Sequence, residues 1–399
     1  MSTSLPLLKL RKQADRRLRA GHLWIYSNEI ETQATPLQGF QAGQEALVES
    51  AEGRALGVAY VNPHSLICAR LISRDPQQGL SVSLFVHRIK QALALREACF
   101  HAPYYRLIYA DSDLLPGLIV DRFGDVLAVQ LNTAGMEQQR QAVLEALIKV
   151  LKPKAIVWRN DSSGRRQEGL DTHIDIAYGQ LDDQVILQEN QTQFYVPLLT
   201  GQKTGWFYDH RENRQRLRQQ VAGLRVLDLF SYVGGWGIQA ATAGAAQVLC
   251  VDSSETALAQ VQANAALNQV ANKVSTLAGD AFDILAQLKA ADERFDVVIA
   301  DPPAFIKRRK DIPKGEQAYS KLNREAMRLL KPNGTLVSAS CSMHLSPEAL
   351  TNAIRASARH LDRHAQIFFC GHQGADHPIH PAIAETEYLK AFMVRVYRD

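Results

Sequence analysis

Two short segments late in the chain carry residue types suited to chemistry on a planar base. Asp301-Pro302-Pro303 follows an apolar run, and the two prolines fix φ and remove N–H donors, so that the turn holds the carboxylate rigidly. Cys341 stands in Ser340-Cys341-Ser342, at the end of the next apolar run. A thiolate that adds to carbon 6 of a pyrimidine makes carbon 5 nucleophilic, and a carboxylate near N3 stabilises a cytosine adduct. Cys341 and Asp301 are therefore the predicted catalytic residues.

The other four cysteines are predicted to be small core residues. Cys68, Cys99, Cys250 and Cys370 are scattered, and no two cysteines form a C-x-x-C pair, so the sequence predicts neither a zinc site nor a disulfide framework. Cys341 differs from them by its place among small polar residues at a strand end. It would have to be ionised to react, and the sequence does not show which basic group would favour the thiolate.

Three carboxylates at successive predicted strand ends indicate a ligand without a phosphate. Asp228 precedes a glycine-rich loop, Asp252 follows 24 residues later, and Asp280 stands beside Phe282. An ammonium group, a ribose and an adenine would occupy them in that order, which is how S-adenosylmethionine is held. The loop lacks the G-x-G-x-x-G pattern, so a nicotinamide oxidoreductase is the least favoured reading. The predicted cofactor contacts are Asp228, Phe230, Tyr232, Gly234, Asp252, Asp280, Phe282, Asp301 and Pro302.

The elements that must position these side chains alternate between strand and helix from about residue 189 onward. Helices are predicted at 255–267 and 319–330, between apolar strands at 226–229, 247–252, 274–277, 295–300 and 334–339. Such alternation predicts a Rossmann-like α/β domain with a parallel sheet covered on both faces, whose ligands bind beyond the carboxyl ends of the strands.

Two smaller blocks precede this domain. Residues 1–74 alternate short apolar runs with turn residues, which predicts a small β-rich domain. Residues 75–188 combine helices at about 82–97 and 136–151 with strands at 117–121, 126–131 and 155–158, which predicts a small α+β central domain. We therefore expect three domains, with boundaries at 1–74, 75–188 and 189–399.

Basic residues gather in two places, although the net charge is only +4. The first twenty residues hold six basic side chains and one acid, Asp15. Lys307, Arg308, Arg309 and Lys310 form a second cluster in a predicted loop and are the predicted RNA-binding residues. No apolar run reaches the roughly 18 residues of a membrane span, and the start lacks a signal-peptide core, so we expect a cytoplasmic protein.

Taken together, these segments resemble the bacterial large-subunit ribosomal RNA cytosine-C5 methyltransferases that carry an N-terminal PUA domain. The resemblance covers nearly the whole chain. The segments 21–30, 113–124 and 201–211 are similar to the start of the PUA domain, a central-domain signature and a segment that closes over the cofactor. The resemblance implies a class I methyltransferase that uses S-adenosylmethionine and acts on large-subunit (23S) ribosomal RNA. Many other RNA cytosine-C5 enzymes have a second cysteine after the prolines, where this chain has Ala304, so the base that removes the carbon-5 proton is unassigned.

Three alternatives stay open at this stage. A methyltransferase of the same fold that acts on a guanine nitrogen would also use the Asp-Pro-Pro turn but would need no thiol. A uridine-C5 enzyme would need the cysteine, although an ionised Asp301 suits N3 of cytosine better. A non-catalytic RNA-binding protein is disfavoured by the complete series of acids and by Cys341. The sequence identifies neither the nucleotide nor the oligomeric state, and it predicts no metal site.

Overall fold

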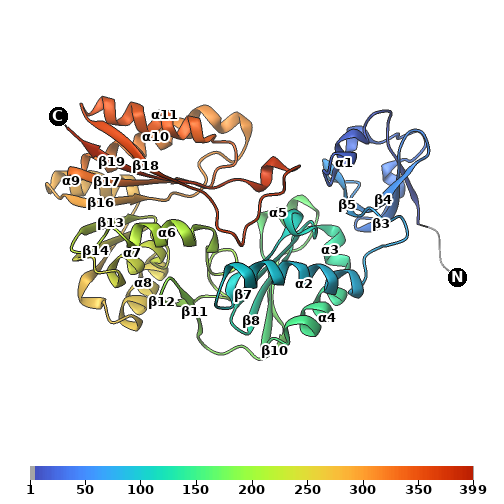
Figure 1. The fold of residues 1–399 in the computed structure, drawn as a ribbon, viewed down its shortest axis with the longest axis horizontal. Coiled ribbons are helices and arrows are strands. Elements are labelled where there is room, and N and C mark those ends of the chain that lie inside the picture. The colour runs from blue at the N-terminus through green and yellow to red at the C-terminus, as the bar shows by residue number, and fades with distance from the viewer. Residues whose placement is uncertain (1–4, 399) are drawn as a thin grey trace. The chain divides into compact units, whose positions relative to one another are not determined.

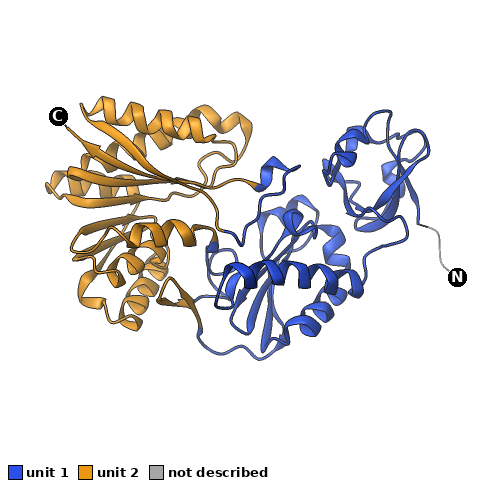
Figure 2. Ribbon diagram, viewed as in Figure 1, with its two compact units in different colours: residues 1–185, 196–208, 375–386 blue, residues 186–195, 209–374, 387–399 orange. Residues whose placement is uncertain are grey.

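The computed structural model describes residues 5–398, and the chain divides into two compact units. Unit 1 takes in the chain up to Val185 together with Val196–Tyr208 and Ala375–Thr386 (Figure 2). Unit 2 consists of Ile186–Tyr195, Asp209–Gly374 and the chain from Glu387 onward. Each unit therefore contains stretches that are distant in the sequence.

The N-terminal part of unit 1 is a small β-rich domain, as predicted. Its five strands form one sheet in the order β1-β3-β4-β5-β2 (Figure 1). They are β1 (Leu7–Lys9), β2 (Trp24–Tyr26), β3 (Gln44–Glu49), β4 (Ala55–Val61) and β5 (Ile67–Ser73). The short helix α1 (Arg16–Arg19) lies between β1 and β2 in the chain and buries Leu18. Burial alternates along β3, whereas the last five residues of β4 are all buried.

The central part of unit 1 is a five-stranded sheet in the order β10-β9-β8-β7-β6. Its strands are β6 (Tyr104–Tyr109), β7 (Leu118–Phe123), β8 (Val126–Leu131), β9 (Ala155–Asn160) and β10 (His173–Gly179). Helices α2 (Val82–Cys99) and α4 (Arg140–Leu151) pack on it, and α5 (Ser163–Gln167) is a single short turn. The helix predicted at 136–151 is in fact two helices, because α3 (Ala134–Gln138) ends at Gln139, whose ψ of 13° is not helical.

Unit 2 is built on a seven-stranded sheet in the order β15-β14-β13-β16-β17-β19-β18. The strands are β13 (Arg225–Leu229), β14 (Gln247–Asp252), β15 (Val274–Ala278), β16 (Phe295–Ala300), β17 (Leu330–Ser340), β18 (His364–Gly371) and β19 (Lys390–Tyr397). The strands β13 to β17 pair in parallel, which confirms the predicted α/β fold. The antiparallel pair β18 and β19 was not predicted.

Helices cover both faces of this sheet (Figure 1). One face carries α6 (Arg211–Arg218), α7 (Gly235–Thr242) and α8 (Glu255–Leu267). The other carries α9 (Ala281–Ala290), α10 (Ile312–Arg328) and α11 (Pro347–His360), whose apolar side chains share one core with the strands. The hairpin of β11 (Val185–Glu189) and β12 (Thr192–Val196) precedes the sheet.

Two predicted boundaries are wrong around the second basic cluster. Helix α10 begins at Ile312 rather than 319, because Pro313 suits a first helical turn and Gly315 lets the helix pack tightly on Ile306. The cluster is consequently not all loop, since Arg309 and Lys310 lie in the short 3₁₀ helix η6 (Arg309–Asp311).

Among residues 5–398, the chain has no helix whose length and apolar character would let it cross a bilayer.

The segment Ala375–Thr386 joins β18 to β19 and belongs to unit 1. Its residue Ile383 is fully buried in the core of the N-terminal domain, together with residues such as Leu10, Leu23 and Ile25. The segment ends in the short 3₁₀ helix η7 (Ala384–Thr386), where the Tyr109 hydroxyl donates to the Thr386 carbonyl at 3.1 Å. We call Ala375–Thr386 the connecting strap.

Candidate active site

The first of the predicted cofactor carboxylates, Asp228, is fully buried near the end of β13. Its Oδ2 accepts the Gly237 N–H at 2.8 Å, while its Oδ1 has no hydrogen-bond partner within the described part of the chain. Burial raises the pKa of Asp228 to about 8, although the Gly237 N–H works in the opposite direction. A buried carboxyl oxygen without a donor suits the ammonium group of an amino-acid ligand.

The loop after β13 adopts a backbone that most residues avoid. Phe230 and Tyr232 have φ values of 59° and 48°, and Gly234 has 87° at the start of α7. The first two are non-glycine residues in the left-handed region, where strain is typical of functional loops. Both side chains are half-buried, and the buried Ser231 hydroxyl has no partner among residues 5–398. The loop therefore presents polar groups and two aromatic rings at the carboxyl end of β13.

The second and third carboxylates stand at the ends of the neighbouring strands. Asp252 ends β14, and its two oxygens accept the backbone N–H groups of Tyr232 and Ser254, each at 2.9 Å. It thereby fixes the strained loop, and its remaining lone pairs can accept ribose hydroxyls. Asp280 is exposed and caps α9 by accepting the Phe282 N–H at 2.9 Å. Asp252 and Asp280 are thus both engaged with backbone, at the strand ends where they were predicted.

Asp301 follows β16 and is held by two donors. Its Oδ1 lies 3.2 Å from His210 Nε2, and its Oδ2 accepts the Trp236 indole N–H at 3.0 Å. Asn213 Nδ2 lies 3.2 Å from His210 Nδ1 and also donates to the His372 carbonyl, which orients the ring with Nε2 toward Asp301. Burial opposes ionisation, but His210 and Trp236 outweigh it and lower the pKa of Asp301.

Cys341 comes directly after β17 and is partly exposed. The strands β16 and β17 are parallel neighbours, with Ala300 opposite Ser338. Asp301 and Cys341 therefore both lie at the carboxyl end of the sheet. Buried hydroxyls tie the two turns together. Ser342 Oγ accepts the Ile306 N–H at 3.2 Å, and the Tyr319 hydroxyl lies 2.8 Å from Ser340 Oγ and 2.9 Å from Ser342 Oγ. The predicted catalytic pair is thus positioned by adjacent strands and one hydroxyl network.

Lys390 and His210 belong to this site and were not predicted from the sequence. Lys390 begins β19 opposite Ser340, is 7% exposed, and donates from Nζ to the Ser342 carbonyl at 2.7 Å. His210 is 4% exposed and packs against the Trp236 ring. Lys390 was missed because β19 was not predicted. His210 lies in segment 201–211, whose resemblance to a segment that closes over the cofactor was the available signal, but no role was assigned to the residue.

The two basic clusters differ in how far their charges are already paired. Lys307, Arg308, Arg309 and Lys310 are all exposed, and among the described residues only Arg308 of these four forms an ion pair, with Asp311 at 3.4 Å. In the N-terminal domain, Lys9 pairs with Glu49, Arg17 with Glu29 and Arg19 with Asp15. Three side chains of each cluster have no ion pair within residues 5–398: Lys307, Arg309 and Lys310 in one, and Arg11, Lys12 and Arg16 in the other.

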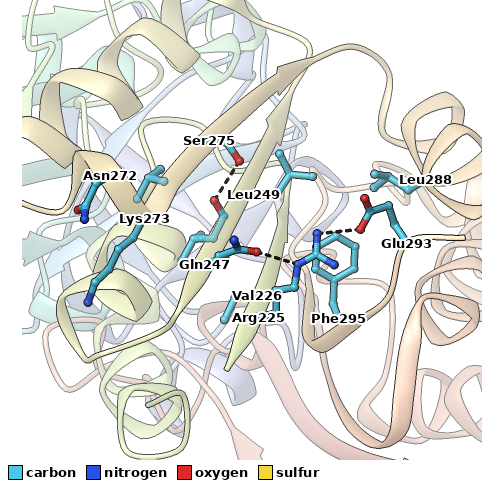
Figure 3. Close-up of a pocket in the computed structure, with 12 residues that line it drawn as sticks. Arg225, Val226, Gln247, Leu249, Asn272, Lys273, Ser275, Leu288, Glu293 and Phe295 are labelled. Atoms are coloured by element: carbon cyan, nitrogen blue, oxygen red, sulfur yellow. Dashed lines mark hydrogen bonds and ion pairs between the residues drawn. The ribbon is translucent and has the colours of Figure 1, made fainter. Parts of the chain in front are cut away.

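A cavity of about 360 Å³ lies at the other end of the strands of the same sheet (Figure 3). It is lined by the amino ends of β13, β14 and β15, and Arg225 pairs there with Glu293 at 2.7 Å and with Gln247 at 3.0 Å. None of the predicted site residues lines it. Ligands of parallel α/β sheets bind at carboxyl ends of strands, so we do not assign the cofactor to this cavity.

The prediction that the other four cysteines are core residues is correct for two of them. Cys68 and Cys250 are buried, whereas Cys99 ends α2 and Cys370 lies on the edge strand β18, and both are exposed. All five cysteines are free thiols. Within residues 5–398, no three His, Cys, Asp or Glu side chains gather in a way that could hold a metal ion.

Comparison with known proteins gives two family matches. The profile of an S-adenosylmethionine-dependent methyltransferase family matches residues 115–395, and that of a PUA-like domain matches residues 8–74. The ribosomal RNA large subunit methyltransferase I of Vibrio cholerae serotype O1 is 35% identical over 98% of this chain and 99% of its own length. The protein of the same name from Shewanella frigidimarina is 34% identical over the same shares.

Among solved structures, SMU.776 complexed with SAH superimposes with a TM-score of 0.84. The alignment covers 98% of this chain and 100% of that one, at 22% identity. At that identity the likeness concerns the fold, which it shows over nearly the full length of both chains.

Proposed function

Because the chain belongs to the family of S-adenosylmethionine-dependent methyltransferases with a PUA-like domain, which includes the ribosomal RNA large subunit methyltransferase I proteins, we propose that it methylates carbon 5 of a cytosine in large-subunit (23S) ribosomal RNA. The names of its relatives support the RNA substrate. The observation that carries the carbon-5 chemistry is the partly exposed thiol of Cys341 at the end of β17, one strand from Asp301. We retain three domains, 1–74, 75–188 and 189–399, as part of the proposal.

The residues at the carboxyl end of the sheet fit the cofactor. Asp228 would hold its ammonium group, Asp252 its ribose hydroxyls, and Asp280 with Phe282 its adenine. The strained loop through Phe230, Tyr232 and Gly234, with Asp301 and Pro302, would complete the pocket. The bound cofactor supplies an electrophilic methyl group.

Cys341 and Asp301 would divide the work on the base. A lone pair of the Cys341 sulfur forms a bond to carbon 6 of a cytosine that has taken up a solvent proton at N3, and the ionised Asp301 accepts the N3–H hydrogen bond. The adduct leaves carbon 5 electron-rich enough to accept the methyl group, and N3 returns its proton to solvent when the product forms. Loss of the carbon-5 proton then restores the ring double bond, and the electrons of the carbon–sulfur bond return to the sulfur. His210 and Trp236 hold Asp301 in place throughout.

The thiol decides between this function and methylation of a guanine nitrogen. We expect Cys341→Ala to abolish methylation of ribosomal RNA, with the wild-type site mapped as a cytosine that resists bisulfite deamination. The matched control is Cys370→Ala, which removes another exposed thiol of the same sheet and should leave activity unchanged. RNA with 5-fluorocytosine at the target should trap a denaturant-resistant adduct, because fluorine cannot leave as a proton does.

The outcome is informative in either direction. Carbon-5 methylation that survives in Cys341→Ala would contradict the nucleophile assignment, and a methylated guanine would favour the alternative enzyme. An adduct on uridine rather than cytosine would retain the thiol but change the base. A bound RNA without any methylated product would favour the non-catalytic reading.

The basic clusters are proposed to contact RNA phosphates. The exposed side chains of Lys307, Arg308, Arg309 and Lys310 follow the Asp-Pro-Pro turn, close in the chain to Asp301. Neutralising all four should weaken binding to all RNA sequences and reduce the slope of log K against log salt by about 0.7–0.9 for each lost contact. Replacing Lys149 and Lys152, basic residues near the end of α4 in unit 1, serves as the control. An unchanged slope would show that the cluster is an ordinary solvated surface.

A further inference from the structure

Lys390 is a buried amine that the scheme above does not use. Its Nζ donates to the Ser342 carbonyl at 2.7 Å and to the Tyr388 carbonyl at 2.8 Å. An ammonium has three donors, so these two bonds leave one N–H. In the described part of the chain Lys390 forms no ion pair with a carboxylate, and two neutral carbonyls do not offset the cost of burying a charge. A nearby anion would stabilise the charged form of this buried lysine.

The reactive thiol is the group that meets this need. In the register of β17 and β19, Ser340 is directly opposite Lys390, and the Ser342 carbonyl accepts from its Nζ, so Cys341 lies between the two contacts. Two other titratable groups face this pair. Tyr319 of α10 is buried, and burial raises its pKa, so it contributes a neutral hydroxyl; Glu387 precedes β19. Burial lowers the pKa of Lys390 to about 8, while Cys341 and Glu387 raise it by their negative charge.

We propose that Lys390 is a positioning residue whose ammonium group holds Cys341 as the thiolate. This inference deepens the proposed function and depends on it for its catalytic meaning. Lys390 keeps its proton throughout: the sulfur lone pair leaves the ammonium to form the bond to carbon 6, and returns to it when that bond breaks. The two carbonyls fix the nitrogen while the sulfur alternates between anion and thioether.

The test measures the thiol directly, without RNA. The rate of alkylation of Cys341 by iodoacetamide is followed from pH 6 to 9.5 in the full-length protein, with each cysteine-containing peptide resolved by mass spectrometry. We expect Lys390→Met to raise the midpoint of the Cys341 profile by about one pH unit, which lowers the thiolate fraction at pH 7, and with it the alkylation rate, by about tenfold. Lys390→Arg keeps the charge and should restore most of the wild-type rate.

Two controls separate charge from structure. The exposed Cys370 is an internal reference whose profile should not move, and Lys331→Met makes the same substitution at the other end of β17. If Lys390→Met does not fold, Lys390→Gln replaces it, since an amide can still donate to both carbonyls but carries no charge. An unchanged Cys341 profile in a folded Met or Gln variant overturns the proposal.

The two proposals fail in distinguishable ways. If the alkylation profile shifts but Cys341→Ala still methylates RNA, the lysine–thiolate pair stands and the carbon-5 mechanism falls. If Cys341→Ala is inactive and the profile does not shift, the mechanism stands and the role of Lys390 falls.

Discussion

Asp228 and Asp301 are two carboxyls at one end of the same sheet, and their surroundings move their pKa values in opposite directions. Burial dominates at Asp228, whose Oδ1 has no donor in the described structure, and raises its pKa to about 8. At Asp301 burial is outweighed by His210 and Trp236, which lower the pKa. At neutral pH the first is mostly protonated and the second ionised. The difference fits their proposed roles: Asp228 would bind the ammonium group of the cofactor, and the ionised Asp301 would contact N3 of the base.

The raised pKa of Asp228 predicts that cofactor affinity increases with pH. Only the ionised carboxyl attracts an ammonium, and its fraction in the free protein grows up to tenfold per pH unit below pH 8, so affinity should rise by nearly tenfold from pH 6 to 7. Isothermal titration in buffers of different ionisation enthalpy should also detect a proton released on binding. The stability of the free protein should change in the opposite direction and fall as the pH rises from 3.8 to about 8. In this range the Asp228 carboxyl of the unfolded chain is already ionised, whereas that of the folded protein still holds its proton, so a rising pH favours the unfolded state.

Asp228→Asn should bind weakly and lose this pH dependence. The matched control is Asp296→Asn, at the start of β16, because the pKa of Asp296 is lowered and it stays ionised between pH 6 and 7. A pH-independent affinity in the wild-type protein would remove Asp228 from the proposed ammonium site.

At the scale of elements, the close packing of α7 on β13 and β14 shapes the loop after β13, which is proposed to bind the cofactor. A Cβ at Gly237 would lie 2.5 Å from Cys250 Sγ and 3.0 Å from Asp228 Oδ2. Gly237→Ala should therefore lower the free energy of unfolding by about 1–3 kcal/mol and weaken cofactor binding, as measured by urea denaturation and calorimetry. Gly39→Ala, where a Cβ meets nothing within 4 Å, is the control. Adding Cys250→Ala should recover part of the loss; strict additivity of the two changes would contradict a steric cause.

The sequence predicted the strands of the parallel sheet well because apolar runs of β-branched residues are a local signal. The helix at Glu255–Leu267 and the strands at Gln247–Asp252 and Phe295–Ala300 have the predicted bounds. The edge strand β18 mixes polar and apolar residues, so its pairing depends on β19, whereas β19 itself carries the apolar run Ala391–Val394 and was overlooked. For the same reason Lys390 was missed beside Cys341, and the positive φ of Phe230 and Tyr232 had no glycine to indicate it.

At the scale of the whole molecule, the connecting strap makes the N-terminal domain depend on a late part of the chain. Ile383 is fully buried in that domain's core. Ile383→Ala should destabilise unit 1 by about 2–5 kcal/mol, the usual cost of such a cavity, and lower the temperature at which unit 1 unfolds in differential scanning calorimetry. Ile379→Ala removes a similar side chain from an exposed position of the strap and should change little. Equal effects of the two substitutions would show that the strap is not part of that core.

The strap also sets an order of events during synthesis. The strands of the N-terminal domain are complete by Ser73, but its core also contains Ile383. About 300 residues separate them, which takes roughly 15–60 s at 5–20 residues per second. Until then the emerging chain carries an apolar hollow where Ile383 will sit. A polypeptide that stalls before Ala375 would keep that hollow open, so the β-rich domain can complete its core only after the strap has been synthesised.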